Sequence, residues 1–407
     1  MNKDEIIPHL FRTEFTKITS VLCKLLHIEN ISIAEDIASD TFLSAIEIWT
    51  YNGIPTNPTA WLYAVAKNKA KNYIHRESIF KNKIIVKLDG KEKDFPLDID
   101  WSLENIKDSQ LQMLFAICHP VISIEAQVGL ALRILCGFGI EEIADAFLSN
   151  KETINKRLHR AKEKLREANV PIEFPGTHEM KDRCRAVLTT LYLLFNEGYY
   201  SESNNEVLRE DLCLEAMRLL NMLIENEPTN SPPANALLAL MCFHASRFPA
   251  RKNERGEMVL YHDQNESLWD QTLIAKGIYF LNQASQGDEL STFHLEASIA
   301  YWHTIKSDTP EKWNNILQLY NHLLQIQYSA IAALNRAYAL SKVKGIPQAI
   351  FEAEKLQLIE NHYYFTLLGV LYKDIDREKA KENLLKALQL AKTISDKNSI
   401  QAIINRQ

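Results

Sequence analysis

Residues 140–166 read IEEIADAFLSNKETINKRLHRAKEKLR and predict two short helices joined by a tight turn. Apolar residues recur at helical spacing on both sides of the turn, so each helix should bury one face. Ser149 and Glu152 fit the S-x-x-E capping box, which pairs free backbone N–H groups, and we expect this box to start the second helix. The two apolar stripes are Ile140, Ile143, Ala144 and Phe147, followed by Ile154, Leu158, Ala161 and Leu165.

The second of these helices is strongly basic away from its apolar stripe. Basic and amide side chains on an exposed helix can contact phosphates and base edges in a major groove, so the pair is typical of a DNA-binding helix-turn-helix. The alternative is a solvated helical surface, which Lys/Arg-rich amphipathic helices often form. The polar positions carry Lys151, Asn155, Lys156, Arg157, His159, Arg160, Lys162, Lys164 and Arg166.

A second basic helix is predicted upstream. Asn57-Pro58 forms a good N-cap and first helical position, and PTAWLYAVAKNKAKNYIHRE follows from residue 58. Between residues 61 and 87 the single acidic residue is Glu77, although the whole chain has a net charge of −6. Such segregation predicts a strip that faces phosphates. The basic residues in this range are Lys67, Lys69, Lys71, Arg76, Lys81, Lys83 and Lys87.

An acidic amphipathic helix precedes the basic one. Residues 32–49, SIAEDIASDTFLSAIEIW, place acidic side chains beside apolar ones, as in helices that dock on another protein. Between the two basic helices, Asp89-Gly90, Pro96 and an acidic run interrupt the helical pattern. We interpret this stretch as a polar, flexible linker, for which an ordinary solvated loop is the simpler alternative.

The order of these features resembles the bacterial extracytoplasmic-function sigma factors, RNA polymerase subunits that select promoters. The motifs are AEDIASDTFLSAIEIW, NGIPTNP, AWLYAVAKNKAKNYIHRE and the helix-turn-helix. The segment that begins LFAICHPVISIEAQ, followed by RCRAVLTTLYLLFNEGYYSES, further resembles the subgroup with a long C-terminal tetratricopeptide-like extension. This sequence departs from that subgroup at Ile117, where two adjacent cysteines commonly precede His-Pro. The departure weakens any redox or metal role for Cys118.

The resemblance implies an all-α protein with two small helical sigma domains and a C-terminal helical-repeat domain. Residues 1–80 would form sigma domain two, 81–108 the linker and 109–174 sigma domain four. Residues 180–407 would form the tetratricopeptide-like domain. In its last part, 363–393, small and aromatic packing positions fall at Leu368, Gly369, Tyr372, Ala380 and Ala387. Stacked helical pairs form concave binding surfaces, so we expect this domain to regulate the sigma domains by direct contact.

The resemblance also implies three sets of site residues. Core RNA polymerase would be contacted by Asp36, Asp40 and Phe42. The minus-ten promoter element would be opened and held by the loop 52–57 and by Asn57, Trp61, Asn68, Lys69, Asn72 and Arg76. The minus-thirty-five element would be read by Asn155, Lys156, Arg157, His159 and Arg160. Which of the basic side chains touch bases and which touch phosphates stays open at this point.

Composition and the remaining motifs narrow the other possibilities. With 46% hydrophobic and 24% charged residues, the 407-residue chain is typical of a globular protein of two or three domains. No membrane span and no export signal are apparent, so we expect a cytoplasmic protein. The six scattered cysteines should be buried and free of disulfides. No catalytic motif or cofactor site is predicted, because the sequence has no P-loop, no G-x-S-x-G and no G-x-G-x-x-G. No metal site is predicted, because histidines 294, 303, 322 and 362 lack metal-like pairings.

Two weaker interpretations are kept. The chain could be a helix-turn-helix regulator of another class with a tetratricopeptide-like sensor, or a tetratricopeptide scaffold without DNA function. Neither explains the acidic docking helix together with the Trp-led basic helix. A polar patch of Asp263, Glu266, Trp269 and Asp270 beside Arg251, Lys252 and Arg255 could also form a partner contact or be merely solvated.

Overall fold

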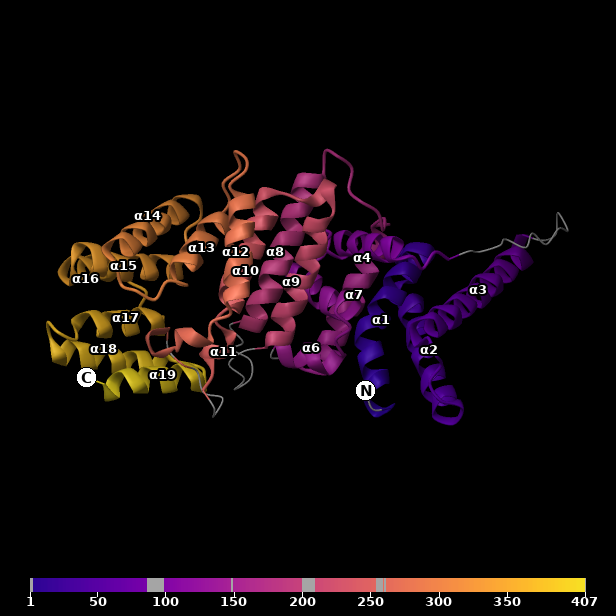
Figure 1. Cartoon of the computed structure of the whole chain (residues 1–407), viewed down its shortest axis with the longest axis horizontal. Helices are drawn as coiled ribbons and strands as arrows, with labels where there is room; N and C mark the ends of the chain where they lie inside the picture. The colour runs from indigo at the N-terminus through magenta and orange to yellow at the C-terminus, as the bar shows by residue number, and fades with distance from the viewer. Residues whose placement is uncertain are drawn as a thin grey trace. The chain divides into compact units, whose positions relative to one another are not determined.

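The computed structural model describes residues 3–85, 99–147, 149–199, 209–253, 259 and 261–406. Its regular elements in these ranges are all helices (Figure 1), so the predicted all-α class is confirmed. The chain divides into two compact units, residues 1–193 (unit 1) and 194–407 (unit 2). The long helix α8 begins in unit 1 and ends in unit 2.

Unit 1 is built around its first helix. Buried side chains of this helix, among them Phe15, Ile18 and Leu22, form the centre of the core. The helix packs against α2, α4 and the first part of α3, while the rest of α3 leaves this bundle (Figure 1). The elements are α1 Lys3–Leu26, η1 Ile28–Asn30, α2 Ile31–Asn52, α3 Pro58–Ile85, α4 Leu103–Ile117, α5 Ile124–Leu130, the π-helical turn η2 Ala131–Leu135, α6 Ile140–Ala146, α7 Lys151–Glu167 and α8 Met180–Tyr199.

The two helices predicted over 140–166 are present as α6 and α7. The apolar stripe predicted for α7 is confirmed, since its four members are its buried residues. The capping box predicted at Ser149 and Glu152 is wrong by one residue. Asn150 is the N-cap, and its side chain accepts a hydrogen bond of 2.8 Å from the backbone of Thr153. Ser149 instead donates its backbone N–H to Ala144 and so closes the preceding helix.

Local caps also set the limits of α3 and α4. The side chain of Asn57 accepts a hydrogen bond from the backbone N–H of Ala60, as its predicted capping role requires. Helix α4 starts at Leu103, after an N-cap at Ser102. Both ends of the segment interpreted as the linker, 81–108, are therefore helical. The side chains of Lys81 and Lys83 lie outside the described part of the chain. The described residues also leave out Lys87, Asp89, Gly90, Asp94, Pro96 and Asp98.

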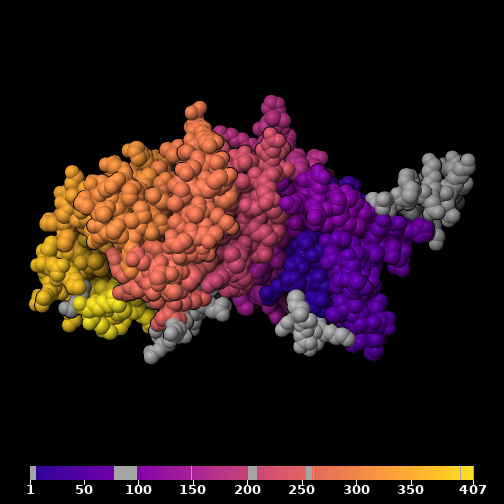
Figure 2. Space-filling model, in the orientation of Figure 1, coloured from indigo at the N-terminus to yellow at the C-terminus, as the bar shows by residue number. Residues whose placement is uncertain are grey.

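Unit 2 contains helices that pack mainly on their neighbours in sequence. Helix α10 is almost entirely buried and packs against α9, α12 and α13. The later helices, α14 to α19, pack in succession and form a continuous orange-to-yellow surface in Figure 2. The elements are α9 Glu210–Glu225, η3 Glu227–Thr229, α10 Pro232–Ala245, α11 Phe248–Arg251, η4 Tyr261–Asp263, η5 Glu266–Leu268, α12 Gln271–Ala284, α13 Thr292–Trp302, α14 Pro310–Ile326, α15 Ala330–Lys344, α16 Ile346–Glu354, α17 His362–Tyr372, α18 Arg377–Leu390 and α19 Ile394–Asn405.

The contact between α17 and α18 depends on small residues. All five packing positions predicted in residues 363–393 are buried. A Cβ atom on Gly369 would lie 2.6 Å from Cγ of Leu384, which is closer than two carbon atoms can approach. The missing side chain of Gly369 therefore allows the two helices to approach closely.

All six cysteines are buried, as predicted. Burial raises the pKa of Cys118 to about 12 and that of Cys184 to about 11, which keeps these thiols protonated at neutral pH. Among the described helices, none is long and apolar enough to cross a membrane.

Candidate functional site

Helix α2 presents an acidic stripe on its outer face. Asp36 and Asp40 are exposed and are followed at helical spacing by Leu43 and Glu47, which are exposed as well. Leu43 is 56% exposed, so the stripe combines negative charge with one apolar side chain. This combination suits a contact in which acidic groups meet basic ones around a small apolar centre.

Phe42 lies on the opposite side of the same helix, in the core. It is 3% exposed, and its ring centroid lies 5.1 Å from that of Phe11 in an edge-on contact. Phe42 therefore supports the acidic stripe from within, and Leu43 is an exposed apolar residue of the stripe that the sequence interpretation missed. The signal was available, because Phe42 shares its helical register with the buried residues Ala38, Ala45 and Trp49.

A sharp turn and an aromatic contact fix the start of α3. Gly53, with φ of +80°, ends α2 and donates its N–H to the carbonyl of Trp49 at 3.1 Å. Positive φ is readily available to glycine. The rings of Trp49 and Trp61 then meet edge to face with centroids 5.2 Å apart. Trp61, half-buried, is thus held in place at the beginning of α3.

The residues predicted to contact the minus-ten element share one face of α3. Asn68, Asn72 and Arg76 are exposed and spaced at four-residue intervals, and the half-buried Lys69 lies beside them. At the base of this helix, Tyr63 donates a hydrogen bond of 2.5 Å to Glu14 and stacks on Trp101 with centroids 4.7 Å apart. Burial and then the hydrogen bond to Glu14 raise the pKa of Tyr63, so this phenol stays neutral and positions α3.

On α7, four of the five predicted minus-thirty-five residues are exposed, namely Asn155, Lys156, His159 and Arg160. Lys156 and Arg160 have no carboxylate partner among the residues that the structure describes. Nδ1 of His159 lies 3.4 Å from the carboxylate oxygen Oε2 of Glu163. Arg157 is half-buried, with its guanidinium 5.8 Å from the centroid of Phe147, so it also packs against the end of the preceding helix.

Glu35 joins three segments of unit 1. It precedes Asp36 in sequence but is only 6% exposed, and its carboxylate accepts a hydrogen bond of 3.1 Å from Nε of Arg133 and another from Nζ of Lys162. Lys162 belongs to α7, so it is not one of the free basic side chains that the sequence suggested. The sequence could not separate Glu35 from Asp36, because both are acidic and adjacent.

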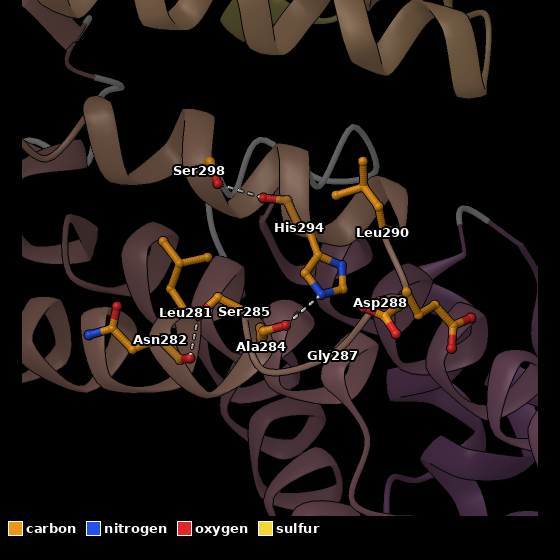
Figure 3. A pocket seen from close by; sticks show the side chains of 10 residues that line it. Leu281, Asn282, Ala284, Ser285, Gly287, Asp288, Leu290, His294 and Ser298 are labelled. Atoms are coloured by element: carbon orange, nitrogen blue, oxygen red, sulfur yellow. Dashed lines mark hydrogen bonds between the residues drawn. The ribbon is translucent and has the colours of Figure 1, made fainter.

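Unit 2 has a pocket of about 370 Å³ between the end of α12 and the start of α13 (Figure 3). His294 points into this region, and Nε2 of its ring donates to the carbonyl of Ala284 at 3.1 Å. Its Nδ1 accepts the backbone N–H of Ser291. Both ring nitrogens are therefore used in joining the two helices, and neither is available to a ligand.

Two family models match parts of the chain. Sigma-70 region 2 matches residues 10–79, which include most of α1 together with α2 and the basic face of α3. This match supports a sigma-70 family RNA polymerase sigma factor with a role in promoter recognition. Residues 183–285 match a family of unknown function, DUF6596.

A relative matches the chain over nearly its whole length. The chain is 32% identical over 381 residues to an uncharacterized protein of Rhizobium meliloti (strain 1021), and the match covers 91% of this chain and 89% of that protein. The two proteins thus share both units. No solved structure matches the chain.

Proposed function

We propose that this chain is a sigma factor of the extracytoplasmic-function type that docks on core RNA polymerase and reads two promoter elements. The observation that carries the proposal is the match of residues 10–79 to sigma-70 region 2, together with the acidic stripe on α2 and the basic face of α3 inside that match. Sigma factors perform no covalent chemistry of their own, so the activity is one of binding and positioning.

The acidic stripe would form the contact with core polymerase. Asp36 and Asp40 would face basic side chains of the clamp helices in the largest subunit, with Leu43 as the apolar centre. Phe42 would contribute by fixing the helix from the core side. The exposed amides and cations of α3 would then hold unstacked bases of the minus-ten element. These contacts must offset the few kcal/mol that unstacking a base costs.

Helices α6 and α7 would form the helix-turn-helix that reads the minus-thirty-five element. The support is the buried stripe of α7 and the exposed side chains on its outer face, with Lys156 and Arg160 the best placed to meet DNA. A helix-turn-helix regulator of another class is not favoured, because it leaves the region 2 match unexplained. We further propose that the helical region from residue 180 onward modulates these activities.

Asp40→Arg is expected to weaken the binding of core polymerase about tenfold or more, because the reversed charge would face basic residues. The measurement is the dissociation constant of the full-length variant for core enzyme. Asp374→Arg is the matched control, since it makes the same charge change at an exposed position of unit 2. Equal affinity of the Asp40→Arg protein and the natural one would remove Asp40 from the interface.

Arg160→Ala is expected to cost about 1–3 kcal/mol of promoter binding if the guanidinium reads a guanine edge, and to relax specificity at one base pair. Transcription with core polymerase and a library of promoters measures both effects. A uniform loss over all promoters, with a smaller salt dependence, would identify a phosphate contact instead. If the natural chain and core enzyme initiate at no promoter of the library, the proposed function is wrong.

A further inference from the structure

Five side chains of unit 2 meet in a group that we call the cation cluster: Arg247, Arg251, Lys312, Tyr199 and Tyr261. Tyr199 ends α8, the two arginines flank and end α11, Tyr261 begins η4 and Lys312 lies in the first turn of α14. Apart from Lys312, they all fall within residues 183–285, the range matched by the family of unknown function.

The cations of this cluster lie on aromatic rings and are close to one another. The guanidinium of Arg251 lies 3.9 Å from the centroid of Tyr199, and Arg247 donates to the hydroxyl of that same tyrosine at 3.1 Å. Both Arg247 and Lys312 lie near the ring of Tyr261, at 5.5 Å and 5.6 Å from its centroid. Lys312 also donates to the hydroxyl of Tyr261 at 3.3 Å.

Negative charge does not balance these cations. Lys312 is 0% exposed and Arg251 is 6% exposed, and no ion pair joins either of them to a carboxylate in the described part of unit 2. The carboxylate of the nearby Asp308 already has two other partners. It forms an ion pair of 3.0 Å with Nζ of Lys342 and accepts a hydrogen bond of 2.6 Å from Nε1 of Trp313. Buried charges without a counter-ion are strongly unfavourable.

The surrounding histidines are held neutral. Burial, together with the charges of Arg247 and Lys312, lowers the pKa of His303 to about 3. Burial also lowers the pKa of His244, with Arg247 and Arg251 adding to the effect. The positive charges of the cluster therefore act on the histidines beside it.

Two hydrogen-bond donors at the cluster have no acceptor. Nη1 of Arg251 and Nε1 of Trp269 are buried and make no hydrogen bond. Trp269 is 4% exposed and stacks on Tyr261 with centroids 6.2 Å apart. Since buried donors are nearly always paired in folded proteins, these two point to an acceptor that the described residues do not supply. Arg247 and Tyr261, both half-buried, connect the cluster to solvent.

We propose that the cation cluster binds a phosphate group, either free or carried on a small molecule. Two guanidinium groups and an ammonium exceed the charge of one carboxylate, whereas a phosphate group carries about 1.5 to 2 negative charges at pH 7. Phosphate oxygens are also the acceptors that arginine binds best. The site would give unit 2 a ligand of its own, whatever the role of the sigma domains.

The test is thermal unfolding of the full-length protein with inorganic phosphate, phenyl phosphate, acetate or chloride at equal ionic strength. Phosphate or its ester should raise Tm by about 5 °C or more at saturation, and acetate and chloride should not. Arg251→Met should abolish this rise. Without phosphate, the variant should have an unchanged or higher Tm, because it loses a buried cation that lacks a counter-ion. A purely structural arginine would instead lower Tm under all four conditions.

Arg218→Met is the matched control, because this arginine pairs with Glu215 at 2.8 Å and should leave the response to phosphate intact. If Arg251→Met does not fold, Trp269→Phe removes the other unpaired donor and should reduce the response. A response to phenyl phosphate alone would identify an ester as the ligand. Three results would overturn the proposal: a Tm in phosphate no higher than in chloride, an equal rise in Tm with acetate, or a rise that the Arg251 or Trp269 variant retains in full. The last result would indicate that phosphate binds elsewhere, for example on the basic surfaces of unit 1.

Discussion

Glu35→Ala is expected to destabilise unit 1 by about 3 kcal/mol, because it leaves Arg133 and Lys162 without their shared carboxylate. Both cations are largely buried, with side chains 23% and 19% exposed, so water cannot fully replace the lost partner. Arg133 keeps its hydrogen bond to the carbonyl of Phe138, which limits the loss. Removal of one member of a buried ion pair is far more costly than removal of an exposed one.

Hydrogen exchange resolved by peptide measures this loss locally. Protection should fall in α2, in the π-helical turn 131–135 and in α7, the three segments that Glu35 joins. Glu163→Ala is the control, because Glu163 is a more exposed acid on α7 that pairs only with surface side chains. It should change stability by less than about 0.5 kcal/mol. Equal effects of the two substitutions would contradict the bridging role of Glu35.

A chain that ends after Glu179 is expected to lose about 3 kcal/mol of unit 1 stability relative to one that ends after Tyr199. The first half of α8 donates two hydrogen bonds to unit 1: Arg183 to the carbonyl of Phe115 at 2.5 Å, and Thr190 to the side chain of Gln127 at 2.8 Å. Their removal leaves buried acceptors unpaired, at about 1–3 kcal/mol each. Chemical denaturation of the two truncated chains measures the difference.

This comparison also makes the proposed regulation testable. We would compare promoter-specific transcription by the chain ending at Tyr199 with that by the full-length protein, at matched concentration. The comparison tests the effect of the region beyond α8, because both proteins keep α8 itself. A difference in activity or in core binding would support regulation. Equal activity of two folded proteins would leave the region beyond α8 as an independent interaction module. If the chain ending after Glu179 is as stable as the longer one, the two hydrogen bonds contribute little.

The sequence predicted the helices and their buried faces well, because apolar spacing reports directly on burial. The stripe of α7 and the packing positions of α17 and α18 are examples. Capping was predicted less accurately, since Ser149 and Asn150 are both good N-caps and only the path of the chain selects between them. The start of α4 at Leu103 was missed because acidic residues in a first helical turn resemble a solvated loop.

Tertiary contacts between distant residues could not be predicted from local patterns. Nothing near Glu35 in the sequence indicates Arg133 or Lys162, and the acceptor for Arg183 is a backbone carbonyl in another helix. For the same reason the sequence interpretation placed Arg251 in a surface patch, whereas it is buried on the ring of Tyr199. The polymerase and promoter contacts remain predictions, to be decided by the variants of Asp40 and Arg160.

The burial of every cysteine has a practical consequence for labelling. Maleimides react with exposed thiolates, and the six natural thiols are buried, with the pKa of Cys242 also raised to about 12. A single cysteine placed at an exposed position such as Ser32 on α2 or Asp374 in unit 2 would then be the group that reacts at neutral pH. Site-specific fluorophores can thus be attached while all the native cysteines are kept, and distances between the two units can be followed in solution during assembly with polymerase.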